Sequence, residues 1–385
     1  MTRINRREGL ALGASLALGT LAGSSPSSAA PLPPGPTLNA IAQTKRMRFG
    51  SSMCWADPGV DAASYNNPTY SSLVAYECGL IVPENELKWP VVQWSPTGYN
   101  FARFDGMLAF AQAHGLAVRG HNILWNQPQA MPAWLESYNF GANPATEAAR
   151  VLTDHVNTYV KRYLTSIFEW DVVNEAVNPA DGTLFSTALS RAMGGAIPAM
   201  DLAFHTAHAA APSAKLVYND YMCWEPGYEK HRAGVLSLLQ GFRARGVPVH
   251  ALGVQSHLVA QGTNIAAAVA AQTPAWRSFL NQVVAMGYSL VVTELDVRDT
   301  NLPADQITRD RAVADYAQAY LSMMMGYPQL TDVVVWGMVD KYSWLQTAIP
   351  RADHLPARPC PYNKDYYSKS FRAGIGRAFS LAKSR

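Results

Sequence analysis

The amino-acid sequence predicts an α/β fold in a single domain, the (β/α)8 or TIM barrel, on three observations. Short apolar runs alternate along the chain with stretches of helical periodicity. The chain has 385 residues, of which 49% are hydrophobic, and this is ample for one large core. Nearly every apolar run ends in a polar side chain, as expected where strand ends gather around the mouth of a barrel.

Eight apolar runs have the length and the β-branched content of buried parallel strands. They span residues 46–53, 79–85, 116–125, 167–175, 215–220, 251–257, 289–296 and 332–338. A doubly wound open sheet would show the same alternation, but no glycine-rich phosphate loop follows the first run. Eight strand–helix units in one long domain therefore favour the closed barrel.

Helix signals lie between these runs. The apolar residues of one expected helix share a face: Phe104, Leu108 and Ala111. Gly115 follows them as a C-terminal stop. A capping side chain before a first-turn proline predicts two helix starts, at Asn143-Pro144 and at Thr273-Pro274. Apolar residues return at roughly helical spacing in a further segment: Ile307, Val313, Tyr316, Tyr320 and Met324.

Residues 1–30 predict an export signal peptide, because a basic start, an apolar middle and a small-residue end follow one another. The pair Arg6-Arg7 fits the twin-arginine route, and an ordinary signal peptide with two arginines fits equally well. The apolar middle is too short for a membrane anchor, so we expect export to the periplasm or the medium, with cleavage near Ala29 or Ala30. Residues 31–45 are interpreted as an N-terminal spacer and residues 46–385 as the catalytic barrel.

The charge balance argues against polyanionic partners. Lys and Arg total 31 against 28 Asp and Glu, and no polybasic run is present, so we expect no nucleic-acid and no membrane partner. We expect a monomer.

The four cysteines form no CxxC motif and no Cys/His cluster, so no metal site is predicted. They are Cys54, Cys78, Cys223 and Cys360. Export permits disulfides, but their pairing does not follow from the sequence. Cys54 and Cys360 would lie just past the first and eighth strands, which are neighbours in a closed barrel. We therefore expect these two near each other and Cys78 at the opposite end.

The stretch "FEWDVVNEA" (168–176) raises a question, because a buried strand ends in an amide and a carboxylate, Asn174-Glu175. A Glu near a core is costly unless it is paired or used. A second carboxylate, Glu294, ends the seventh strand, across the mouth from the fourth. Glycoside hydrolysis needs such a pair, one carboxyl protonated and one ionised. Either residue alone would be a solvated strand end, and it is the pair on this scaffold that indicates catalysis.

Other side chains at the strand ends could support this pair. His257 and Asp296 could orient the ionised carboxylate and keep it charged, although a purely structural histidine is the alternative. The segment "PENELKW" (83–89) gathers donors and acceptors for neutral sugars, although a solvated turn would look similar. Tryptophans that could stack on sugar rings, or belong to the core, are Trp89, Trp125, Trp336 and Trp344.

Seven motifs in order resemble the signature of family 10 glycoside hydrolases, the endo-β-1,4-xylanases. They are "PENELKW", "RGHNILW", "WDVVNEA", "NDY", "VQSHL", "TELDV" and "WGMVDKYSW", and the match runs from about Phe49 to the C-terminus. The resemblance implies a retaining enzyme that hydrolyses internal bonds of xylan through a covalent glycosyl-enzyme, with no cofactor and no metal.

The resemblance also implies residue roles. Glu175 would be the general acid/base, Glu294 the nucleophile, and Asn174 the partner of the sugar 2-hydroxyl. Residues expected on the non-reducing side are Glu84, Asn85, Lys88 and Trp89. Residues expected around the reacting sugar are His121, Trp125, Gln255, Trp336 and Trp344. Residues expected to support the nucleophile are His257 and Asp296, and those expected on the leaving-group side are Asn219 and Tyr221.

The chain departs from the family pattern at Asn126, where the family usually has His, and in a longer 127–133 segment. These departures bear on the leaving-group side. Three alternatives remain: a metal-dependent barrel hydrolase that uses the His and carboxylate residues as ligands, a non-catalytic sugar-binding barrel, and a cellulase or mannanase. The sequence does not predict a preference for decorated xylans or a product length.

Overall fold

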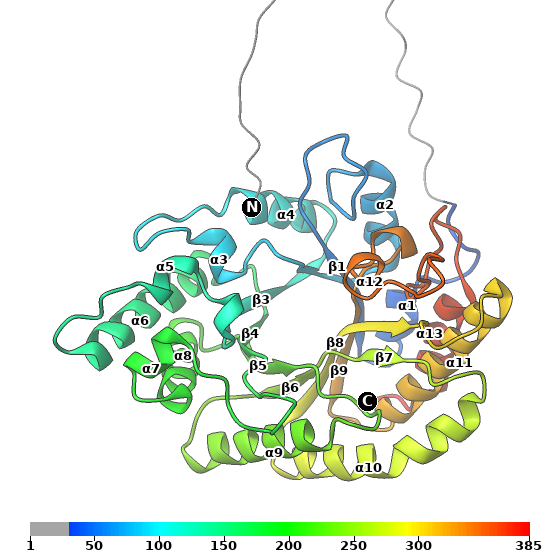
Figure 1. Cartoon of the computed structure of the whole chain (residues 1–385). Helices are drawn as coiled ribbons and strands as arrows, with labels where there is room; N and C mark the ends of the chain where they lie inside the picture. Colours follow the sequence, from blue (N-terminus) through cyan, green and yellow to red (C-terminus); the bar gives the residue numbers. More distant parts are fainter. Residues whose placement is uncertain (1–30) are drawn as a thin grey trace, which may run out of the picture.

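The strands close into a parallel barrel (Figure 1). The computed structural model describes residues 31–385, and the predicted signal peptide, residues 1–30, lies outside them. The ring runs β1-β2-β3-β4-β5-β6-β8-β9, the β6–β8 pairing helps to close it, and the short β7 pairs with the end of β8. The strands are β1 (Arg48–Met53), β2 (Leu80–Pro83), β3 (Ala117–Trp125), β4 (Glu169–Asn174), β5 (Lys215–Asp220), β6 (Ala251–Val254), β7 (His257–Val259), β8 (Ser289–Arg298) and β9 (Leu330–Val335).

Helices surround this ring (Figure 1). Those that follow successive ring strands are α2 (Pro68–Glu77), α4 (Ala102–Ala113), α6 (Pro144–Arg162), α8 (Ala196–Ala210), α9 (Glu229–Ala244), α10 (Ile265–Ala285), α11 (Gln306–Met324) and α13 (Ser370–Leu381). Shorter helices are α1 (Leu38–Gln43), α3 (Trp89–Val92), α5 (Ala133–Glu136), α7 (Ala188–Ala192) and α12 (Leu345–Ala348), with 3-10 turns at Pro128–Ala130 and Asp340–Tyr342. No described helix has the length and apolar character to cross a membrane.

A buried ionic cluster lies inside the barrel beneath its mouth. Arg119 of β3 is fully buried and pairs with Glu169 and, at 2.6 Å, with Asp171 of β4. Asp171 also contacts Nδ1 of His121 at 2.9 Å. Because buried charges are tolerated where they are paired, this cluster fixes β3 against β4 and sets the orientation of the His121 ring.

The predicted barrel is confirmed, and each predicted strand begins within two residues of its observed start. One strand differs in kind, because the sixth was expected to run unbroken to His257. It ends instead at Val254, Ser256 adopts a left-handed φ of 63°, and the chain restarts as β7. The break places His257 opposite Asp296 in the β7–β8 register.

Two of the expected helix starts have different outcomes. α6 begins at Pro144 as predicted, although the Asn143 side chain makes no capping hydrogen bond. The start at Thr273-Pro274 is wrong, because α10 begins at Ile265 and Pro274 lies inside it. The Asn264 side chain caps this helix by accepting from the backbone N–H of Ala267.

Other helix and terminus predictions are refined by the structure. α4 ends at Ala113, and Gly115 follows with a φ of 64°, as expected of a C-terminal stop. Ile307 does not share the buried face of α11, since it is 75% exposed. The expected spacer, residues 31–45, contains α1, whose buried Leu38 joins the core, so this part belongs to the domain.

All four cysteines carry free thiols in the structure. No disulfide therefore joins Cys54, directly after β1, to Cys360, which lies in the loop after β9. Their expected proximity stays a prediction.

Candidate active site

A cavity of about 490 Å³ opens at the C-terminal ends of the strands. Sixteen residues were expected to form the site, and fourteen of them line this cavity. Those fourteen are Glu84, Asn85, Lys88, His121, Trp125, Asn174, Glu175, Tyr221, Gln255, His257, Glu294, Asp296, Trp336 and Trp344. Eight different strands and their loops thus converge on one hollow, as the barrel topology requires.

Glu294 is a buried carboxylate held by two donors. It lies on β8, where its Oε1 accepts from Nδ2 of Asn219 at 2.8 Å and its Oε2 lies 3.2 Å from Nε2 of His257. Burial alone would raise the pKa of Glu294. The His257 hydrogen bond, the charges of His121 and His257 and the Asn219 hydrogen bond outweigh it and lower this pKa to about 2. Glu294 is therefore ionised at neutral pH.

His257 lies between two carboxylates. Its Nδ1 lies 3.0 Å from Oδ1 of Asp296, opposite the Nε2 contact with Glu294. Trp344 fixes Asp296 by donating its indole N–H to Oδ2 at 2.8 Å. Burial would lower the pKa of His257, but Asp296 and then Glu294 raise it to about 10. The imidazolium form beside Glu294 is thus stable over the physiological range.

Glu175 leaves its strand in a strained conformation and enters a different environment. β4 ends at Asn174, and Glu175 adopts a left-handed φ of 50°, a conformation that L-residues keep mainly at functional sites. Its Oε2 accepts from the indole of Trp125 at 2.9 Å and from Gln127 at 3.0 Å, and its Oε1 accepts from Gln255 at 2.8 Å.

The pKa of Glu175 is opposite to that of Glu294. Burial raises it to about 7, the hydrogen bond from Gln255 opposes this, and the negative charges of Asp220 and Glu294 add to it. One cavity therefore holds a carboxyl that keeps its proton to about neutral pH and a carboxylate that does not. This is the acid and base assignment that glycoside hydrolysis requires.

A chain of amides links the two carboxyls. Nε2 of Gln255 contacts Glu175 and also Oδ1 of Asn174, at 3.5 Å. Nδ2 of Asn219 donates both to Oδ1 of Asn174, at 2.9 Å, and to Glu294. Since Oδ1 of Asn174 accepts from both neighbours, its Nδ2 group is left to donate into the cavity that Asn174 lines.

The model of glycosyl hydrolase family 10 matches residues 38–378 of the chain. The chain belongs to glycosyl hydrolase family 10. Endo-1,4-beta-xylanase 1 of Gibberella zeae is 31% identical over 274 residues, which are 71% of this chain and 74% of the relative. Endo-1,4-beta-xylanase 5 of Pyricularia oryzae is 31% identical over 296 residues, 75% of this chain and 68% of the relative.

Solved structures show the same barrel fold. Native xylanase 10B from Thermotoga maritima superposes with a TM-score of 0.77 at 24% identity, covering 89% of this chain and 98% of that one. Xylanase 10B from Thermotoga petrophila, in complex with xylobiose, gives 0.77 at 23% identity, covering 90% and 97%. At these identities the likeness concerns the fold.

Two of the sixteen expected site residues, Trp89 and Asn219, do not line the cavity. Trp89 does not line the cavity, because it is 2% exposed and stacks on His155 in the core with ring centroids 3.6 Å apart. Asn219 does not line it either. It lies fully buried beneath the cavity, where it orients Asn174 and Glu294. The missing side chain of Gly253 makes room for it, since a Cβ there would lie 2.4 Å from its Oδ1.

One half of the mouth is formed by residues that follow β2 and β9 and by residues of β3. Burial raises the pKa of Glu84 there to about 7, and the charge of Lys88 opposes this. Lys88 donates to Oδ1 of Asn85 at 2.9 Å, and its ammonium lies 4.9 Å from the ring of Trp125. The rings of Trp336 and His121 meet in a T-shaped arrangement, with their centroids 5.5 Å apart. This half offers fixed donors and acceptors beside aromatic faces, which suits neutral sugar rings.

The other half of the mouth, along β5, β6 and β7, holds residues that the sequence reasoning missed. Tyr228 and Arg298 line the cavity there. Gln127, in the segment 127–133 that departs from the family pattern, contacts Glu175. Arg298 could have been found, since it follows Glu294 and Asp296 on the same face of β8. Gln127 and Tyr228 lie in or beside loops, where no periodicity reports which way a side chain points.

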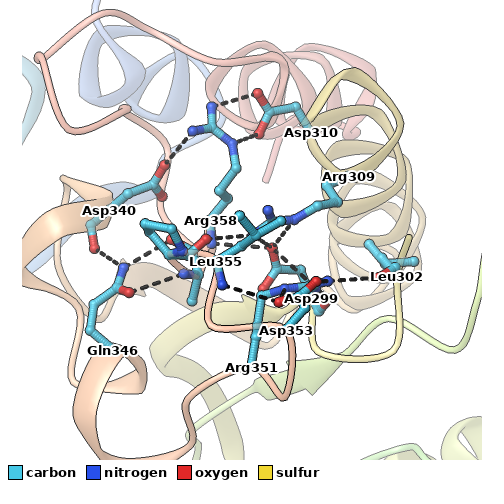
Figure 2. Close-up of polar contacts among 12 residues, drawn as sticks. Asp299, Leu302, Arg309, Asp310, Asp340, Gln346, Arg351, Asp353, Leu355 and Arg358 are labelled. Carbon is cyan, nitrogen blue, oxygen red and sulfur yellow. Dashed lines mark hydrogen bonds and ion pairs between the residues drawn. The ribbon is translucent and has the colours of Figure 1, made fainter. Parts of the chain in front are cut away.

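A second ionic network holds the loop after β9 (Figure 2). This loop carries Trp344 and Leu345 to the cavity. Arg351 donates to the backbone carbonyls of Asp299 and Leu302, at 2.9 Å to Leu302, and pairs with Asp353 at 2.6 Å. Arg358 pairs with Asp310 at 2.7 Å. Arg351 and Arg358 thus tie this wall of the cleft to the β8–α11 connection and to α11 itself.

No group of three or more His, Cys, Asp or Glu side chains within residues 31–385 is arranged to hold a metal ion. His121, one candidate ligand, is committed to Asp171.

Proposed function

We propose that this chain is a retaining endo-β-1,4-xylanase that hydrolyses internal β-1,4 bonds of xylan by double displacement. The observation that carries the proposal is a pair of carboxyls in one cleft with different partners: Asn219 and His257 hold Glu294, whereas neutral donors such as Trp125 and Gln255 hold Glu175. These surroundings lower the pKa of Glu294 to about 2, and burial raises that of Glu175 to about 7. The family membership and the xylanase names of its relatives supply the substrate class.

In the first step, Glu294 attacks the anomeric carbon while Glu175 donates its proton to the leaving glycosidic oxygen. The bond to the leaving sugar breaks and an ester to Glu294 forms. Nδ2 of Asn174 donates to the 2-hydroxyl of the sugar, an interaction that strengthens as positive charge develops on the ring. His257 disperses the charge of Glu294 before the attack and stabilises it as leaving group afterwards.

In the second step, Glu175, now a carboxylate, takes a proton from water. The resulting nucleophile attacks the anomeric carbon, the ester bond breaks, and Glu294 returns as a carboxylate. Two inversions give net retention. Gln255, Trp125 and Gln127 donate to Glu175 and stabilise its ionised form in this half of the cycle. The groups that these steps need are all side chains of this cleft.

Substrate binding follows the two halves of the mouth. Sugars on the non-reducing side of the cleavage point would contact Glu84, Asn85 and Lys88, with Trp336 beneath the reacting sugar. Tyr221 and Tyr228 would face sugars on the leaving-group side. The cleft's many contacts on both sides of Glu175 suit internal cleavage of a long chain by an exported monomer.

A reducing-sugar assay on xylan, cellulose and mannan tests the proposal. We expect activity on xylan that survives a metal chelator, with early products of mixed length. Activity confined to cellulose or mannan would refute the substrate class. Activity that a chelator abolishes and zinc restores would refute the mechanism.

A further inference from the structure

One cation in the cleft has no counter-charge. Arg298 is the last residue of β8, and it lines the cavity with Tyr221, Tyr228 and Val259. Its guanidinium makes no hydrogen bond or ion pair within residues 31–385, and its Nε atom is buried without a hydrogen-bond partner. A guanidinium that lines a cleft and has no partner among the described residues is free to bind one that arrives with the substrate.

Unlike Arg298, three neighbouring arginines each have a carboxylate partner. Arg309, Arg351 and Arg358 each meet a carboxylate, Asp299, Asp353 and Asp310 respectively, at 2.5–2.7 Å (Figure 2).

The carboxylates nearest in the chain to Arg298 are committed elsewhere. Asp296, two residues before it on the same strand face, is shared between His257 and the indole of Trp344. Glu225 accepts from the backbone of Val259, the register partner of Arg298, at 2.8 Å and from the Tyr316 hydroxyl at 3.0 Å. Neither forms an ion pair with the guanidinium of Arg298, so no described carboxylate is paired with this cation at the cavity wall.

The position of Arg298 within the cleft is set by the barrel. β8 carries Glu294 across the mouth from Glu175, and Arg298 lies four residues further along the same face, beside β7. Burial raises the pKa of the nearby Tyr228 phenol, and the charge of Arg298 opposes this rise. The guanidinium thus belongs to the half of the mouth that the proposed function assigns to the leaving group.

We propose that Arg298 binds the carboxylate of a uronic acid substituent on a sugar of the leaving-group side, and so favours acidic over neutral xylan. A guanidinium fork matches a carboxylate with two parallel hydrogen bonds, whereas the xylan main chain presents only neutral hydroxyls. Glu294 and Asp296 would repel an anionic substituent that entered the cleft without such a cation. The inference rests on the proposed function and specifies its substrate.

The test compares one xylo-oligosaccharide that carries a glucuronate with the same compound after reduction of its carboxyl group to an alcohol. kcat/KM is measured on both, at pH 6 and low salt, for the wild type, Arg298→Gln, Arg298→Lys and Arg311→Gln. Arg311 lies exposed on α11 and serves as the matched loss of one positive charge. The quantity of interest is the ratio of the two kcat/KM values for each enzyme.

We expect the wild type to prefer the acidic compound and Arg298→Gln to lower the ratio about tenfold, mainly through KM. Arg298→Lys should retain part of the preference, because it keeps the charge and loses the fork. Arg311→Gln should leave the ratio unchanged. In the wild type, raising the salt toward 1 M should reduce the preference, because the Debye length falls to about 3 Å.

Equal losses on both compounds in Arg298→Gln would overturn the inference and assign the guanidinium to main-chain hydroxyls or to folding of the cleft. An unchanged ratio with unchanged activity would also overturn it. A wild type that cleaves linear xylo-oligosaccharides but shows no preference for the acidic compound refutes this inference alone. A wild type inactive on linear xylo-oligosaccharides refutes the proposed function, and this inference with it.

Discussion

Replacing Asp296 by Asn should change the acidity of the nucleophile without touching the nucleophile itself. Asp296 and Glu294 together raise the pKa of His257 from 6.5 to about 10. At 1.36 kcal/mol per tenfold change in proton affinity, this difference corresponds to roughly 5 kcal/mol in favour of the imidazolium. Burial lowers the pKa of His257, and the Asp296 carboxylate is the main group that raises it. Removing its charge should therefore bring the pKa of His257 well below 10.

The loss of imidazolium charge should reach Glu294. Its pKa of about 2, against an ordinary 4.5, depends first on the His257 hydrogen bond opposing burial. In Asp296→Asn we therefore expect this pKa to rise to 4.5 or above. Because Glu294 must be ionised to attack, activity is present above its pKa and lost as pH falls through it. The acid limb of kcat/KM should move upward by about two pH units or more.

The assay is kcat/KM on a soluble xylo-oligosaccharide from pH 3 to pH 8, with stability followed at each pH by circular dichroism. Asp332→Asn is the matched control. It also removes a buried carboxylate, here one paired with Arg48, but at the start of β9, at the other end of the barrel. The control should lose stability without moving the limb. The wild-type limb lies below this pH range, so Asp296→Asn should show a fall in kcat/KM toward pH 3 that the wild type lacks. A variant whose kcat/KM stays as flat as that of the wild type between pH 3 and pH 6 would refute the reasoning about His257.

Three further outcomes follow from the structure. On the alkaline side, kcat/KM should fall tenfold per pH unit above a midpoint near 7, because the proton of Glu175 is present below its pKa of about 7 and lost above it. Gly253→Ala should lower kcat at least tenfold in steady-state kinetics, because the added Cβ would lie 2.4 Å from Oδ1 of Asn219 and displace the donor to Glu294. Trp89→Ala should lower the free energy of unfolding in urea by roughly 3–5 kcal/mol, because it removes a buried core side chain. Trp336→Ala should mainly raise KM, because Trp336 lines the cavity. A raised KM with unchanged stability for Trp89→Ala would show that Trp89 contacts the substrate instead.

The sequence was sufficient for the barrel and for most of its mouth. Glu175 and Glu294 could be found because each lies in the C-terminal part of a buried strand or directly after it, and a closed ring brings these parts of the fourth and seventh ring strands into one hollow. His257 and Asp296 followed from the same topology. A polar residue at the end of a barrel strand can therefore be assigned to the site from the sequence, because the closed ring points the strand ends at the same cavity.

Prediction failed where direction is set by packing. Trp89 begins the short α3, and only the presence of His155 on α6 shows that its ring faces inward. Pro274 looked like a helix start, yet α10 begins at Ile265 with Asn264 as its cap, and Pro274 lies inside it. Gln127 reaches Glu175 from a loop whose course no periodicity encodes. These positions depend on tertiary contacts that a local pattern does not contain.

The assignment of the two glutamates is tested most directly by azide rescue. In Glu175→Ala, a substrate whose leaving group needs no proton should still glycosylate Glu294, and the ester should then accumulate because no base activates water. Azide should attack this ester and give a β-glycosyl azide, identified by the coupling constant of the anomeric proton in NMR. Glu294→Ala should be nearly inactive on every substrate and yield no β-azide. An α-glycosyl azide from Glu175→Ala, or a product of inverted configuration from the wild type, would contradict the account.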